Sequence, residues 1–114
     1  MTPNETPQAS AEILQEFQPR VAAWLYQCFD QSIATSMEER GDRLLEEVFE
    51  LLQSGGYDPV RIAALRDYVW SRPVGETHQE VGGVMITLAT YCHMLGVDMM
   101  RAGFSELRRI LEPD

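Results

Sequence analysis

Hydrophobic residues recur along this chain at the spacing of α-helices, and short polar breaks divide the chain into segments. The first stripe steps by three or four residues from Leu14 to Cys28. Pro19 interrupts this stripe, so the helix either starts near the proline or kinks there. Further stripes of the same spacing predict helices over approximately residues 36–54, 59–70, 76–95 and 98–111.

Capping residues and helix breakers define the ends of these segments. Ser36-Met37-Glu38-Glu39 has the pattern of a capping box that opens the second helix, and Gly55-Gly56 ends that helix. Asp58-Pro59 predicts an N-cap followed by a proline in the first turn of the third helix, which runs to about Trp70. The last two helices are bounded in the same way, by Gly96, Asp98 and Pro113.

The fold class follows from this pattern. No pair of alternating β-branched runs joined by a hairpin turn occurs, so we expect an all-α protein, a bundle of four to five helices. Residues 1–9 are polar and contain two prolines, which indicates a flexible N-terminal tail, and residues 10–114 form a single helical domain. Short helices with so many apolar stripes favour a homodimer or higher homo-oligomer that completes the bundle.

The charge of the chain narrows the classes of function. It contains 18 Asp and Glu residues against 9 basic residues, all of them arginine, so the formal net charge is −9. Such a chain lacks the basic surface that binds nucleic acid and is repelled by anionic membranes. The longest uncharged stretch, Val81–Val97, is shorter than the roughly 20 residues that span a bilayer. With no signal peptide and no Cys-x-x-Cys motif, we expect a cytoplasmic protein without nucleic-acid or membrane partners.

Three glutamates crowd one edge of the second predicted helix. Glu50 lies one turn after Glu46 and three residues after Glu47. Like charges about 6 Å apart repel by roughly 0.7 kcal/mol in water and by nearer 3 kcal/mol at an effective dielectric of 20. Arg43 can offset part of this repulsion at Glu47, and Mg²⁺ would offset more because it takes hard carboxylate oxygens as ligands. The alternative is a solvated acidic helix face.

A second acidic element opens the fourth predicted helix. Glu80 is the last acidic residue before the long uncharged run, so it lies at the edge of the core, where an antiparallel helix pair would bring it to Glu47 and Glu50. Alternatively, Thr77 and Glu80 form only a capping box. Glu76, one turn before Glu80, shares its face.

The order of these elements resembles the MazG-like family of all-α nucleoside triphosphate pyrophosphohydrolases. The resemblance covers about residues 17–111. The family carries Glu-x-x-Glu on one helix and Glu-x-x-Asp on a later one. Glu47 and Glu50 match the first pair, and Glu46 is an additional acidic neighbour. Glu80 matches the third position, whereas Gly83 stands where the family has aspartate.

This resemblance implies a hydrolase that converts nucleoside triphosphates to monophosphate and pyrophosphate, with a house-cleaning or dUTPase-like role. It implies Mg²⁺, or Mn²⁺ in its place, held by Glu46, Glu47, Glu50 and Glu80, with Glu47 and Glu50 as the catalytic residues. It also implies a dimer. Because Gly83 removes one carboxylate, the alternative is a catalytically impaired helical dimer that binds nucleotide or metal, or serves as an interaction module.

Three further residues are candidates for substrate binding. Trp24 on the first helix stacks on a base, as the resemblance implies, or belongs to the core. His78 stands near the predicted metal site, or is simply an exposed residue at a helix start. Arg109 on the last helix contacts phosphate, for which a guanidinium is well suited, or pairs with a neighbouring acid.

Overall fold

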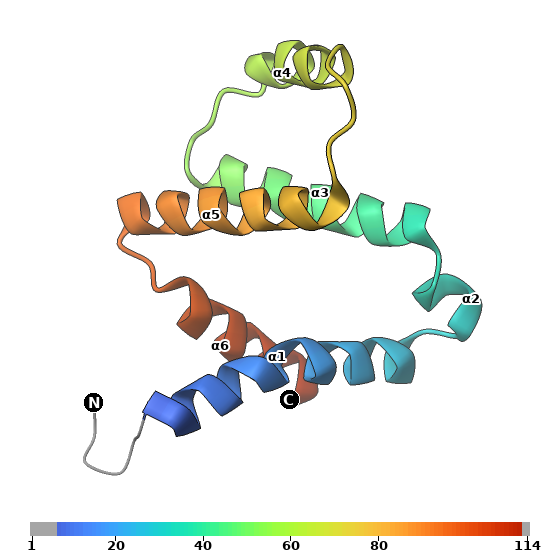
Figure 1. Cartoon of the computed structure of the whole chain (residues 1–114), viewed down its shortest axis with the longest axis vertical. Coiled ribbons are helices and arrows are strands. Elements are labelled where there is room, and N and C mark those ends of the chain that lie inside the picture. The colour runs from blue at the N-terminus through green and yellow to red at the C-terminus, as the bar shows by residue number, and fades with distance from the viewer. Residues whose placement is uncertain (1–6, 113–114) are drawn as a thin grey trace. The chain divides into compact units, whose positions relative to one another are not determined.

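The computed structural model describes the backbone of residues 7–112 and the side chains of residues 15–112. Within this range all regular structure is helical, as the sequence predicts, and no strand occurs (Figure 1). The helices are α1 (Pro7–Cys28), α2 (Gln31–Ala34), α3 (Met37–Ser54), α4 (Val60–Trp70), α5 (Thr77–Leu95) and α6 (Met99–Leu111).

The helix bounds agree closely with the hydrophobic pattern, with two differences in the N-terminal part. Helix α1 begins at Pro7, within the stretch predicted as a tail, and it continues through Pro19 rather than starting there. The short helix α2 was not predicted. It is capped by Asp30, whose carboxylate accepts the Ile33 N–H at 3.1 Å and the Ser32 hydroxyl at 2.6 Å. These two donors, the hydroxyl foremost, lower the pKa of Asp30.

Local chemistry accounts for the ends of the later helices. Gly96 closes α5 with φ of 70°, and the next residue, Val97, donates its N–H to Cys92 O at 2.9 Å. This left-handed C-terminal geometry favours glycine because it costs a side chain about 1–2 kcal/mol. At the start of α4, the Asp58 carboxylate accepts the Val60 N–H at 3.0 Å, as the Asp58-Pro59 pattern predicts.

The helices form two compact units. The first unit contains α1, α2 and nearly all of α6. In it the rings of Phe17 and Phe104 meet edge to face with centroids 5.0 Å apart. Trp24 and Phe29 make a similar contact at 6.1 Å. Ala34 and Leu107 are buried. Other apolar side chains of this unit stay exposed, among them Tyr26, Ile33 and Met37.

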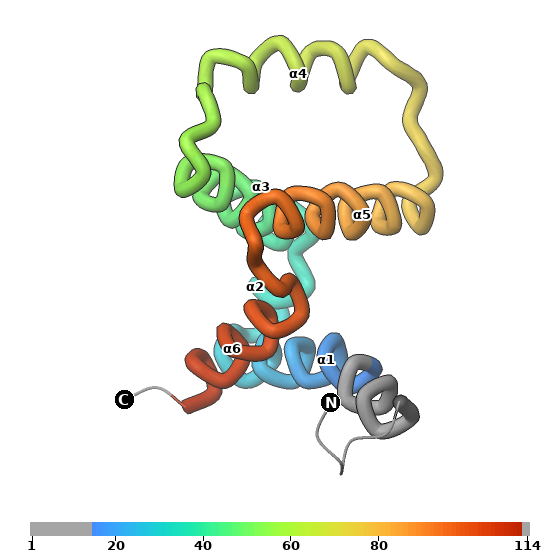
Figure 2. The backbone as a smooth tube through the Cα atoms, turned by 90° about the vertical axis from the view of Figure 1, so that its left-hand side faces the viewer, coloured from blue at the N-terminus to red at the C-terminus, as the bar shows by residue number. Residues whose placement is uncertain are grey.

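The second unit contains α3, α4 and α5. No Cα atom of one of these helices lies within 8 Å of a Cα atom of another, and both views show α4 set apart from α3 and α5 (Figures 1 and 2). Of the side chains described in this unit, only Cys92 is buried. Cys28 and Cys92 are both free thiols, and Cys28 is exposed. Hydrophobic side chains that stay exposed include Leu44, Leu45, Val48, Val81, Val84, Met85 and Ile86.

Candidate functional site

The acidic edge of α3 is exposed along its length. Glu46, Glu47 and Glu50 all lie at the surface. Arg43 pairs with Glu46 at 3.0 Å and with Glu39 at 3.4 Å, rather than with Glu47 as the spacing suggested. Pairs as exposed as these contribute less than about 1 kcal/mol. In the described part of the chain no arginine pairs with Glu47 or Glu50, so two of the three carboxylates keep their charge uncompensated.

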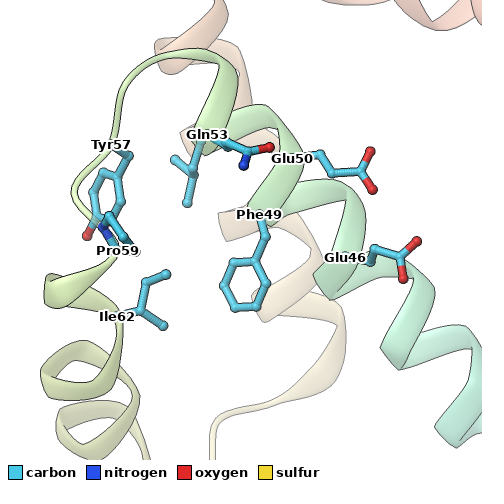
Figure 3. Close-up of a pocket in the computed structure, with 8 residues that line it drawn as sticks. Glu46, Phe49, Glu50, Gln53, Tyr57, Pro59 and Ile62 are labelled. Carbon is cyan, nitrogen blue, oxygen red and sulfur yellow. The ribbon is translucent and has the colours of Figure 1, made fainter.

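A hollow of about 300 Å³ lies beside this edge, between the end of α3 and the start of α4. Figure 3 shows Phe49, Tyr57 and Ile62 facing into it, while the carboxylates of Glu46 and Glu50 extend from α3 on the opposite side from Tyr57 and Ile62. Its volume is at the lower limit of typical ligand pockets. The arrangement puts an aromatic and apolar surface next to a row of carboxylates. The full lining is Glu46, Phe49, Glu50, Leu52, Gln53, Tyr57, Pro59 and Ile62.

The sequence predicted the acidic half of this site but not its apolar half. Tyr57 lies in the turn between two breakers, and Ile62 lies on a different helix. Their convergence on Phe49 depends on the path of the chain between α3 and α4. The only sequence signal was Tyr57 itself, a large aromatic residue placed in a tight turn where small or polar residues are usual.

Glu80 lies in a different hollow. Its side chain folds back on the loop before α5, where Oε1 stands 2.6 Å from the position of a Cβ added to Gly75. The hollow around it measures about 740 Å³ and includes Trp70 and Arg72 but no residue of α3. Arg72 stacks on the ring of Tyr68 at 5.2 Å. The expected approach of Glu80 to Glu47 and Glu50 therefore stays a prediction.

The carboxylates do not form a closed metal site as they are placed. Among the residues that the structure describes, no three His, Cys, Asp or Glu side chains gather closely enough to hold one ion. Gly83, at the position where the predicted motif lacks its aspartate, has open space around it, with nothing within 4 Å of an added Cβ. The three glutamates of α3 and Glu80 can hold one ion together only if the Glu80 side chain moves away from Gly75 and toward α3.

Glu76 caps α5, and Glu80 does not. The Glu76 carboxylate accepts the N–H groups of His78 at 2.9 Å and Gln79 at 2.8 Å. These bonds, that of His78 first, lower the pKa of Glu76 because they favour its charged form. The helix is therefore capped by Glu76, one residue before the Thr77 cap that the sequence predicted. To bind a metal ion, the Glu76 carboxylate would have to break both of these hydrogen bonds.

The three predicted substrate-binding residues have other neighbours. Trp24 is half-buried against Phe29 in the first unit. His78 is exposed on the first turn of α5. Arg109 forms a two-pronged ion pair with Glu106, with Nε 2.9 Å from Oε2 and a second, shorter bond from Nη2 to Oε1. Their hydrogen bonds raise the pKa of Arg109 and lower that of Glu106.

Comparisons with known proteins leave the family open. The chain matches no family model, and no curated protein or solved structure matches it significantly. Among the described residues no single helix is long and apolar enough to cross a membrane; α5 and α6 meet such a criterion only when they are taken together.

Proposed function

We propose that this chain is a Mg²⁺-dependent nucleoside triphosphate pyrophosphohydrolase of MazG-like type, which releases a monophosphate and pyrophosphate. The observation that carries the proposal is the position of Glu46 and Glu50 at the edge of the hollow that contains Phe49 and Tyr57. Aromatic rings take a nucleobase by stacking, and carboxylates take the cation that accompanies the phosphates. The two halves of such a site thus match the two halves of a nucleotide.

The residues of the hollow and of the acidic edge of α3 have distinct roles in this proposal. Phe49 and Tyr57 hold the base, and the amide of Gln53, which lies on the same lining, offers both a donor and an acceptor to its edge. Glu47 and Glu50 are the catalytic carboxylates, because neither is engaged by an arginine. Mg²⁺, or Mn²⁺ in its place, supplies neutralisation of phosphate charge and activation of water when bound. The homodimer and the cytoplasmic location remain predictions.

The test is a panel of nucleoside triphosphates with Mg²⁺ or Mn²⁺, scored for pyrophosphate release. Glu50→Gln removes one candidate catalytic carboxylate and is expected to lower kcat by about 100-fold or more. Glu38→Gln is the matched control, since Glu38 is an exposed glutamate at the other end of α3. The proposal is wrong if no nucleotide is hydrolysed, or if Glu50→Gln leaves the release of pyrophosphate unchanged.

A second function is favoured by Gly83. With a glycine in place of the fourth carboxylate, the chain would retain nucleotide or metal binding without turnover and act as a binding or interaction module. The same panel separates the two functions when nucleotide binding is measured beside it by calorimetry. Binding without pyrophosphate release supports the module, and rapid wild-type turnover excludes it.

A further inference from the structure

The hollow at the loop between α4 and α5 is the larger of the two hollows described above, and the proposed nucleotide site does not use it. Its volume of about 740 Å³ lies within the range of pockets that hold small organic ligands. Trp70, which lines it, is 81% exposed, and Val74 is fully exposed. Val69, Val81 and Val84 also line the hollow. An exposed apolar surface that includes an indole is typical of a binding site.

The hollow also contains one residue of each charge. Arg72 and Glu80 both line it, and in the described part of the chain neither forms an ion pair. Arg72 lies over the ring of Tyr68, with its guanidinium carbon 5.2 Å from the ring centroid, and its Nη1 donates to the Tyr68 hydroxyl at 3.4 Å. The Glu80 carboxylate lies against Gly75. A guanidinium and a carboxylate therefore remain available to one ligand.

These two charges favour a ligand that has a charge of each sign and an apolar body. A carboxylate on the ligand matches Arg72, because a guanidinium binds a carboxylate with two parallel hydrogen bonds. An ammonium on the ligand matches Glu80. A purely anionic ligand such as a nucleotide would be repelled by Glu80, and a purely cationic ligand would be repelled by Arg72. The hollow thus differs in kind from the proposed nucleotide site.

We propose that this hollow binds a short apolar peptide of about two or three residues with both of its ends free. The N-terminal ammonium of the peptide pairs with Glu80, its C-terminal carboxylate pairs with Arg72, and its apolar side chains lie on Trp70 and the valines. A single amino acid would leave much of the hollow empty. Thr77 also lines the hollow, and its hydroxyl can donate to or accept from a peptide amide. The proposal concerns binding alone and does not depend on nucleotide hydrolysis.

Tryptophan fluorescence reports directly on this hollow. The chain has only two tryptophans, and Trp24 lies in the first unit. In a Trp24→Phe background Trp70 is the single indole, and its emission should change when leucyl-leucine is added in buffer without Mg²⁺. We expect a dissociation constant of about 0.1–1 mM for a ligand of this size. Leaving out Mg²⁺ separates the binding of a peptide by Glu80 from its predicted role as a metal ligand.

Blocked peptides test the two charged contacts one at a time. Acetylation removes the ammonium and amidation removes the carboxylate, and each should weaken binding by about tenfold. In Glu80→Gln the acetyl group should weaken binding by no more than about twofold, because the partner of the ammonium is already gone. In Arg72→Gln the same holds for the amide. Arg66→Gln is the matched control, since Arg66 lies outside the hollow and pairs with Asp67, and it should bind all three peptides like its parent.

Three results would overturn the proposal. The first is that no peptide changes the emission of Trp70, and the second is that blocked and free peptides bind equally. The third is that free leucine, or a nucleoside triphosphate, binds as tightly as leucyl-leucine. Because the blocked peptides are compared in a chain with both Glu80 and Arg72 intact, the proposal stays testable even if a variant at either position fails to fold.

Discussion

The Glu80 carboxylate lies directly over Gly75. A Cβ added to Gly75 would stand 2.6 Å from Glu80 Oε1 and 3.0 Å from its carboxyl carbon. Glu80 can fold back on the loop only because residue 75 has no side chain. The identity of residue 75 therefore controls which way the predicted metal ligand points.

Gly75→Ala should redirect Glu80 with little cost in stability. Gly75 does not have a positive φ, and the group that an alanine meets is the flexible end of a side chain, so we expect a change in unfolding free energy below about 1 kcal/mol. Pyrophosphate release should change several-fold, because the carboxylate is pushed off the loop. Measured in a Glu80→Gln background, the same substitution should have no effect on release. If Gly75→Ala changes pyrophosphate release equally in both backgrounds, the change does not act through Glu80.

Gly83→Asp should strengthen metal binding. Residue 83 lies three positions after Glu80 on the same side of α5, and an added side chain there meets nothing within 4 Å. We expect Mg²⁺ affinity, measured by calorimetry, to rise by about tenfold, which corresponds to about 1.4 kcal/mol. Gly82→Asp is the matched control, since its surroundings are equally open but it points away from Glu80. If both variants bind Mg²⁺ alike, the effect comes from net charge and not from the motif.

Gly55, the residue directly after α3, lies close to Tyr91 of α5. A Cβ on Gly55 would collide with the Tyr91 hydroxyl and lie 3.3 Å from the ring carbon that bears it. We expect Gly55→Ala to destabilise the protein by about 1–3 kcal/mol in urea unfolding, and Tyr91→Phe to recover part of that loss. Gly41→Ala, inside α3 with open space around it, should instead stabilise by about 0.5–1 kcal/mol. Equal effects at the two glycines would contradict the contact with Tyr91.

The cap of α5 should depend on pH through Glu76. Its ordinary pKa of 4.5 is lowered in the folded chain, so the charged cap stabilises α5 fully above about pH 4.5. That stabilisation is lost as the pH falls below 4.5 and through the lowered pKa. Glu76→Gln cannot titrate, so its melting temperature should be below that of the wild type at pH 7 and approach it in acid. Asp30 and Glu106, whose pKa values are also lowered, are present in both proteins and cancel in this comparison.

Local features were read correctly from the sequence because they depend on residues three or four positions apart. The acidic edge of Glu46 and Glu50, the capping of α4 by Asp58 and the end of α5 at Gly96 all follow from helical spacing and backbone geometry. Helix α2 was not predicted, because its four residues are too few to show a hydrophobic stripe. The only sequence signal for this helix is Asp30, whose side chain caps it.

The sequence by itself determined the all-α class, the ends of most helices and the row of carboxylates on α3. Only the tertiary structure decided that Tyr57 and Ile62 line one hollow with Phe49, and that Glu80 turns toward Gly75. Helix formation is governed by contacts within one turn, which a sequence shows directly. Which side chain becomes a neighbour on another element depends on how the loops bring distant segments together, and no spacing rule contains that information.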